Sequence, residues 1–217
     1  MAQALQGDIF LAQKKIPQAI EAYQKAYRIN PNDDVLEVLT SLMQMQDPPH
    51  AAIQFLNDAL KQKPLNHAAR LKLASIYQQQ QNLKDAEAHY KTLLETQPDN
   101  ALALNNLAWL YFQQHKPDAL KLAERAYSKA PDTAIILDTY GLILVKQGEL
   151  TQGIAILEKA LQLSPTNGDI HYHLAEAHAS HGNKDQAIKM LQAVLKDHPH
   201  FSERKAAGDL LKHLQAE

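Results

Sequence analysis

The chain has 217 residues, with 22 basic and 24 acidic side chains, no cysteine, seven glycines and ten prolines. The scarcity of glycine and the abundance of Ala, Leu, Gln, Lys and Glu disfavour sheets joined by tight turns and favour an all-α fold. Since basic residues are not clustered and no apolar window is long enough to cross a bilayer, we expect no nucleic-acid partner and no direct membrane insertion.

Proline recurs along the chain at a nearly constant interval. Consecutive members of the series are separated by 33 or 34 residues, which is typical of a repeat protein. The series consists of Pro31, Pro64, Pro98, Pro131, Pro165 and Pro199. The other four, Pro17, Pro48, Pro49 and Pro117, lie near the middle of the first, second and fourth repeats. Because proline interrupts helices, we expect all ten to lie between helices.

Small residues repeat in register with these prolines. One column, at position 20 of a 34-residue repeat, holds Ala19, Ala52, Ala86, Ala119, Gly153 and Ala187. A second, at position 8, holds Gly7, Thr40, Ala74, Ala108, Gly141 and Ala175. Such columns allow two helices of one repeat to approach closely, while larger residues between them fill the space toward the neighbouring repeat.

This pattern resembles the tetratricopeptide repeat, whose signature places small residues at these two positions and proline near the end. The resemblance implies a right-handed superhelical solenoid of six helical hairpins with a C-terminal capping helix over residues 202–216. The repeats, in chain order, are expected at 1–33, 34–66, 67–100, 101–133, 134–167 and 168–201 of a single solenoid covering 1–217. The chain begins inside a first helix, without a signal sequence, so we expect a fragment of a longer protein.

Motifs of catalysis and of cofactor binding are absent from the sequence. It contains no glycine-rich phosphate loop, no nucleophile elbow and no HExxH. We therefore expect no enzymatic activity, no catalytic residue and no cofactor.

Histidines gather in the sixth repeat, where His178 and His181 are i, i+3 neighbours that could share a metal. The interpretation that we prefer places His171 and His178 in packing positions. His173, His181, His198 and His200 would then lie on helix surfaces or in loops, and no metal is expected.

The family resemblance also predicts a binding surface. In tetratricopeptide arrays, the first helix of each repeat lines the concave groove through positions 2, 5, 9 and 12. Carried over to this chain, the groove residues are Leu71, Ser75, Gln78, Leu102, Asn105, Trp109, Phe112, Ile135, Asp138, Leu142, Asp169, Tyr172 and Glu176. This mixture of aromatic, apolar and amide groups suits a peptide or protein segment. We expect Trp109 to face the groove, the alternative being that it packs between helices.

The charges of the predicted groove indicate the type of ligand. No repeat has the Lys and Asn pair at positions 5 and 9 that tetratricopeptide domains use to hold a terminal carboxylate. Asp138, Asp169 and Glu176 instead favour a neutral or basic ligand.

The second half of the chain resembles a more specific family. The segments that carry this similarity are 100–109, 119–127, 137–141, 169–175 and 201–204. They are similar to the tetratricopeptide lipoprotein of exosortase and PEP-CTERM systems in Gram-negative bacteria. The resemblance covers about residues 98–214 and implies an outer-membrane lipoprotein of the cell envelope that assists exopolysaccharide export or protein sorting.

Two classes of function follow, both non-enzymatic. The first is a cell-envelope interaction scaffold that binds a protein or peptide in its groove. The alternative is a cytoplasmic adaptor or regulatory domain. Self-association through the first repeat or the last helix, giving a homo-oligomer, is a third alternative for the partner.

Overall fold

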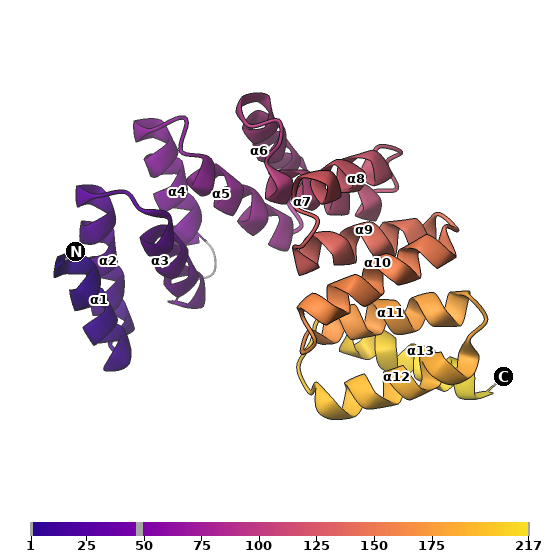
Figure 1. Cartoon of the computed structure of the whole chain (residues 1–217). Helices are drawn as coiled ribbons and strands as arrows, with labels where there is room; N and C mark the ends of the chain where they lie inside the picture. The colour runs from indigo at the N-terminus through magenta and orange to yellow at the C-terminus, as the bar shows by residue number, and fades with distance from the viewer. Residues whose placement is uncertain (1, 47–49, 217) are drawn as a thin grey trace. The chain divides into compact units, whose positions relative to one another are not determined.

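The computed structural model describes residues 2–46 and 50–216 (Figure 1). Within these ranges there are thirteen helices and no strand, which confirms the all-α prediction. The helices are α1 (Ala2–Ala12), α2 (Ile16–Ile29), α3 (Asp33–Gln46), α4 (His50–Gln62), α5 (His67–Gln79), α6 (Leu83–Thr96), α7 (Ala101–Gln113), α8 (Ala119–Lys129), α9 (Ala134–Lys146), α10 (Leu150–Leu163), α11 (Gly168–Ser180), α12 (Lys184–Asp197) and α13 (Arg204–Ala216).

The helices pair in chain order, as expected for helical hairpins. Each odd-numbered helix from α1 to α11 packs against the helix that follows it, and the last helix, α13, packs against α12 and α11. First helices of consecutive repeats also touch, as α7 and α9 do, and α9 and α11. The last helix begins at Arg204, because 202 and 203 form a turn.

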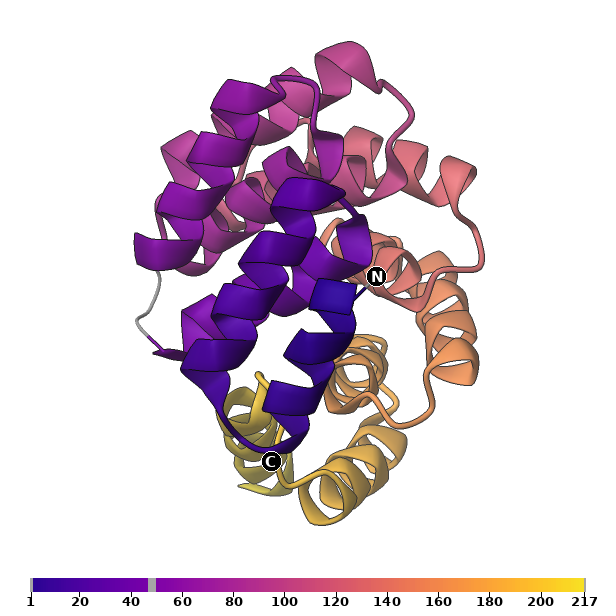
Figure 2. The ribbon, with the colours of Figure 1, turned by 90° about the vertical axis from the view of Figure 1, so that its left-hand side faces the viewer.

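The chain divides into two compact units, Met1–Thr96 and Gln97–Glu217. In each, consecutive helices lie side by side (Figures 1 and 2). We call them the N-terminal unit and the C-terminal unit. The single array over 1–217, and its origin in a longer protein, stay predictions.

The columns of small residues lie where the two helices of a repeat meet. Ala19, Ala52 and Ala86 of the position-20 column are fully buried. A Cβ on Gly153 would lie 2.5 Å from Val145 Cγ2 and 2.9 Å from the carbonyl oxygen of Gly141. Since real Cβ atoms do not approach so closely, helices α9 and α10 could not pack at this distance with a larger residue there.

The recurring prolines lie between helices, as predicted, and so does Pro117. Pro17 departs from the prediction, because it lies in the first turn of α2. That position suits proline, because the backbone N–H groups of the first turn have no acceptor within the helix, so no hydrogen bond is lost. Pro48 and Pro49 lie outside the described residues.

A left-handed residue recurs in the turn between the two helices of a repeat. Gly148 and Gly182 occupy this position with φ of 93° and 85°. Lys14, Gln81 and His115 adopt it with φ between 54° and 61°, although a side chain makes this conformation less favourable. The same backbone turn is therefore built with and without glycine.

Asparagine side chains cap the N-termini of four helices, each of which is the first helix of its repeat. Asn66 Oδ1 accepts a hydrogen bond from the backbone N–H of Ala69, and Asn100 Oδ1 accepts one from Ala103. Asn32 and Asn167 do the same for α3 and α11. These caps fix where the helices with the predicted groove positions start.

No described helix has the length and apolar character needed to span a bilayer.

Candidate functional site

A cavity of about 400 Å³ lies over the first helices of the last three repeats. Helices α7, α9 and α11 supply most of its wall, and the turn before α13 supplies the rest. It is lined by Asn105, Asn106, Trp109, Gln113, Ile135, Asp138, Thr139, Asp169, His173, Ser202 and Glu203. We call it the acidic cavity, because three carboxylates and no Lys or Arg are among these described residues.

Asn105 is the most unusual residue of the acidic cavity. Its side chain is buried, with 3% exposure, and its Oδ1 has no hydrogen-bond partner among the described residues. Its Nδ2 donates to Asn106 Oδ1 over 3.4 Å, at the long end of the range for a hydrogen bond. A buried acceptor without a donor costs about 1–3 kcal/mol, so this amide favours a ligand that brings a donor.

His173 and Asp138 form a buried pair on neighbouring helices. His173 Nδ1 lies 2.7 Å from Asp138 Oδ1, and the two side chains are 9% and 14% exposed. Burial acts to lower the pKa of His173, but the hydrogen bond and charge of Asp138, with the charges of Glu176 and Asp169, outweigh it and raise the pKa. The imidazole therefore favours the protonated form more than an exposed histidine does.

The turn before α13 is attached to the cavity wall by Asp169. Asp169 Oδ1 accepts a hydrogen bond from the backbone N–H of Glu203 over 2.9 Å. This contact places Glu203 at the cavity. Phe201 packs on Gly168, where a Cβ would come within 2.8 Å of the ring, so the start of α11 and the turn touch directly.

Trp109 and Ile135 provide the apolar part of the cavity wall. Trp109 is half-buried, and its ring packs against Phe112 with centroids 5.5 Å apart. Ile135 is 55% exposed. A large ring held by a neighbour gives a ligand contact area at little entropic cost.

The cavity brings together five of the residues predicted for the groove, namely Asn105, Trp109, Ile135, Asp138 and Asp169. Leu102, Phe112, Leu142, Tyr172 and Glu176 do not line it. Leu142 and Tyr172 are buried, at 3% and 8% exposure, so the prediction that they line an open groove is wrong for their side chains. Glu176 forms an ion pair with Lys146 at 2.8 Å.

The three predicted residues of the third repeat belong to the N-terminal unit. Leu71, Ser75 and Gln78 lie on α5 and are half-buried. Gln78 Oε1 accepts a hydrogen bond from the hydroxyl of Tyr90 over 2.9 Å.

Six of the eleven residues that line the cavity were not predicted from the sequence. The omitted residues are Asn106, Gln113, Thr139, His173, Ser202 and Glu203. A signal for three of them was present, because Asn106, Thr139 and His173 occupy position 6 of consecutive repeats and all are polar. Placing His173 on a helix surface was wrong, since it is 7% exposed and bonded to Asp138.

Two other histidines of the sixth repeat, His171 and His178, have protein contacts of their own. His178 is buried as predicted and lies 3.1 Å from Gln186 Nε2 through its Nε2. His171 Nε2 lies 2.9 Å from the carbonyl oxygen of Pro165. The described residues contain no group of three or more His, Asp or Glu arranged to hold a metal.

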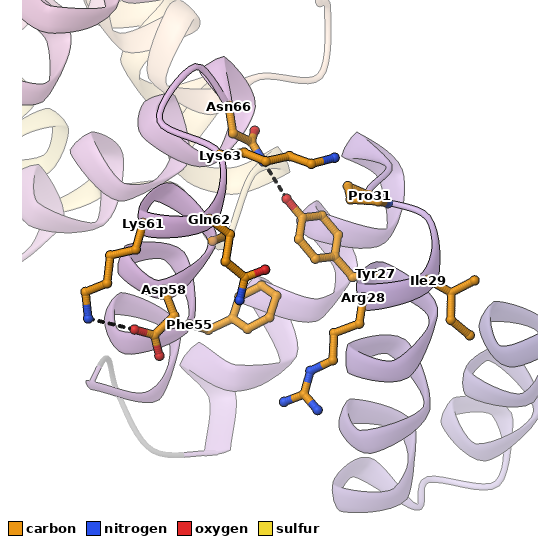
Figure 3. Close-up of a pocket in the computed structure, with 11 residues that line it drawn as sticks. Tyr27, Arg28, Ile29, Pro31, Phe55, Asp58, Lys61, Gln62, Lys63 and Asn66 are labelled. Carbon is orange, nitrogen blue, oxygen red and sulfur yellow. Dashed lines mark hydrogen bonds and ion pairs between the residues drawn. The ribbon is translucent and has the colours of Figure 1, made fainter.

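A second cavity, of about 620 Å³, lies in the N-terminal unit (Figure 3). Second helices, α2 and α4, supply most of its wall. It is lined by Tyr27, Arg28, Ile29, Pro31, Phe55, Asp58, Ala59, Lys61, Gln62, Lys63 and Asn66. Asn66 Nδ2 donates to the hydroxyl of Tyr27 over 2.6 Å, and Lys61 pairs with Asp58 at 2.9 Å. We call it the basic cavity, because its lining contains Arg28, Lys61 and Lys63 but a single acid.

A family model described as tetratricopeptide repeat matches residues 42–110 and 144–210, and a second model of the same description matches 1–34 and 110–168. The chain belongs to the tetratricopeptide repeat family. Proteins of this family bind protein or peptide partners.

Two of the relatives that this tetratricopeptide repeat chain matches are longer bacterial proteins. It is 27% identical over 179 residues to the TPR repeat-containing protein PA4667 of Pseudomonas aeruginosa, covering 81% of this chain and 30% of that protein. It is 29% identical over 158 residues to cellulose synthase operon protein C of Pseudomonas fluorescens, covering 68% and 12%. The chain thus spans less than a third of either relative.

Solved structures share the fold. The crystal structure of the APC/C hetero-tetramer Cut9-Hcn1 superposes with a TM-score of 0.79 at 20% identity, covering 96% of this chain and 41% of that one. This likeness concerns the arrangement of tetratricopeptide repeats alone.

Proposed function

We propose that this chain is a non-enzymatic scaffold that binds a neutral to basic protein segment at the acidic cavity of its C-terminal unit. The observation that carries the proposal is the unpartnered amide oxygen of Asn105 within a cavity built by first helices. A segment of backbone or a polar side chain brings the donors that this amide lacks. Trp109 and Ile135 add apolar contact area beside it.

The geometry of the cavity supports binding rather than catalysis. Ser202 and the His173–Asp138 pair line the same cavity, and this is the residue set from which hydrolases build a nucleophile and its base. Among the described residues no hydrogen bond joins Ser202 to His173, so the contact between nucleophile and base that such a site needs is not formed. We therefore assign the pair to shaping the wall of the cavity.

For the cellular role, we propose a cell-envelope scaffold in exopolysaccharide export or protein sorting. The similarity to cellulose synthase operon protein C supports this choice, as does the resemblance of residues 98–214 to the exosortase-associated lipoprotein. The alternative is a cytoplasmic adaptor. Fractionation of source cells separates the two, since the envelope role requires the protein in the membrane or periplasmic fraction and a purely cytoplasmic protein would contradict it.

Selection of peptides tests the binding proposal directly. A phage-displayed library of random dodecapeptides is selected on the intact chain, and the enriched peptides are measured against two folded variants. We expect Trp109→Ala with Ile135→Ala to weaken them at least about tenfold, because the variant loses most of the apolar wall. The matched control, Phe55→Ala with Ile29→Ala in the basic cavity, should bind like the parent. The proposal fails if no peptide is enriched, or if both variants bind equally well.

A further inference from the structure

The carboxylates of the acidic cavity have acceptor capacity that the protein does not use. Asp138 Oδ1 faces His173, and Asp169 Oδ1 accepts from the N–H of Glu203. The other oxygen of each, and both carboxylate oxygens of Glu203, have no hydrogen-bond partner among the described residues. Glu176 differs, because Lys146 already neutralises it. The cavity therefore offers three carboxylates to a ligand.

Asn105 points independently to a ligand that donates. Its unpartnered oxygen belongs to a side chain that lines the cavity and is 3% exposed. Rotation about the soft terminal torsion of asparagine exchanges its oxygen and nitrogen within nearly the same volume. The amide can thus present its acceptor to a donor that enters the cavity.

The kind of donor follows from the apolar wall. Trp109 is half-buried at the cavity, and indole is the ring that attracts a cation most strongly. A guanidinium group is planar, carries five N–H donors, stacks on aromatic rings and loses water more readily than an ammonium group. It can bind a carboxylate through two hydrogen bonds while its face lies on the indole.

We propose that the acidic cavity is a binding site for an arginine side chain of the partner segment, held by Asp138, Asp169 and Glu203, stacked on Trp109 and bonded to Asn105. This inference rests on the proposed function and names the residue that anchors the ligand. A lysine fits less well, because its ammonium is a strongly hydrated point charge that cannot stack.

The single tryptophan makes the test simple, since its fluorescence reports on this cavity alone. The intact chain is titrated with N-acetyl-arginine amide, N-acetyl-lysine amide and the uncharged analogue N-acetyl-citrulline amide. We expect saturable binding of the arginine probe, at least about threefold weaker binding of the lysine probe, and no saturation with citrulline. Equal binding of the citrulline or the lysine probe would overturn the arginine assignment.

Variants locate the site. Glu203→Gln and Asp169→Asn remove one charge each, and Asn in place of Asp169 keeps an acceptor for the N–H of Glu203. Each should weaken the arginine probe about tenfold, and Asn105→Leu should weaken it also. The matched control is Asp99→Asn, which changes an exposed carboxylate of the same unit that pairs with Lys129. Circular dichroism confirms that each variant is folded. Binding unchanged in both charge variants would refute the site.

The two proposals can fail separately. Peptides that are enriched and depend on Trp109, but lack arginine and compete with no arginine probe, would leave the scaffold standing without its arginine site. Conversely, saturable binding of the arginine probe with no enriched peptide would retain the cavity and reject the protein-segment scaffold.

Discussion

The acidic cavity and the basic cavity differ in size, in charge and in how their polar groups are satisfied. The basic cavity is larger, and its central polar contact, from Asn66 to Tyr27, is complete (Figure 3). The acidic cavity is smaller, but it contains a buried amide oxygen without a partner among the described residues and three carboxylates with no Lys or Arg beside them in the cavity lining. The smaller cavity therefore has the buried polar atom with unused hydrogen-bonding capacity.

The helices that build the cavities explain this difference. Second helices α2 and α4 form most of the basic cavity, and the long side chains of Arg28, Lys61 and Lys63 lie at its wall. First helices α7, α9 and α11 form most of the acidic cavity, and the acids Asp138 and Asp169 and the amides Asn105 and Asn106 lie at its wall. Four predictions test this difference between the cavities and between the units that contain them.

The largest change in stability is expected for Asp138→Ala in the acidic cavity, compared with Asp58→Ala in the basic cavity. Asp138→Ala leaves His173 buried without its partner, so the free energy of unfolding should fall by about 2 kcal/mol. Asp58→Ala breaks an exposed pair with Lys61 and should cost about 0.5 kcal/mol or less. Urea unfolding followed by Trp109 fluorescence and by circular dichroism measures both. Equal losses would contradict the burial argument, and Asp138→Asn should lose less than Asp138→Ala.

Removing a polar group should change the free energy of unfolding in opposite directions in the two cavities. Asn105→Leu removes an unpartnered buried amide and should raise the free energy of unfolding by about 1 kcal/mol. Tyr27→Phe removes a hydroxyl that receives a hydrogen bond from Asn66 and should lower it by about 1 kcal/mol. Thermal unfolding of the two variants beside the parent decides this. Destabilisation by Asn105→Leu would mean that the amide is satisfied in solution.

One histidine from each unit, His173 and His89, should contribute to stability with opposite pH dependence. The raised pKa of His173 stabilises the fold below the ordinary value of 6.5, and this contribution is lost as pH rises through the folded pKa. Burial is the main cause that lowers the pKa of His89, so its contribution is lost as pH falls below 6.5.

NMR titration of the imidazole resonances measures both values, and Asp138→Asn should remove the upward shift of His173. The destabilisation caused by His173→Gln should shrink as pH rises. Burial also lowers the pKa of His178 in the same unit, so the comparison is made between variants and not from the pH profile of the parent alone. A His173 pKa below that of His89 would reverse the assignment.

The smallest effect is expected where the two units are alike. Gln81→Gly and His115→Gly relieve a positive φ in the same turn of each unit, and each should gain about 0.5 kcal/mol. Gly148→Ala is the converse control, since its added Cβ meets open space and any loss comes from the backbone. Melting temperatures by calorimetry check all three. A loss in both glycine variants would show that the original side chains stabilise the turn.

Much of the fold could be predicted from local chemistry. The proline period fixed the helix pairs, and small residues such as Ala19 and Gly153 marked the close contacts between helices. These predictions succeeded because a proline or a missing side chain acts within one turn of the chain.

The candidate site was predicted only in part, because its members come from three repeats and a turn. Repeat position identified Asn105, Trp109 and Asp138 as facing one side of the helices. It could not show that Leu142 and Tyr172 rotate into the core, nor that the turn brings Glu203 to the same cavity. Those outcomes depend on how neighbouring helices pack, which a single repeat does not encode.

Sequence alone was enough to show that the chain is helical, that its helices pair in repeats of 33 or 34 residues, and which small residues lie at the contacts within a repeat. Only the tertiary structure decided that His173 is buried against Asp138 and that Asn105 keeps an unpartnered oxygen beside three carboxylates. The physical reason is range. Helix formation is set by neighbours along the chain, whereas burial and hydrogen-bond satisfaction are set by side chains that are distant in sequence and meet only after packing.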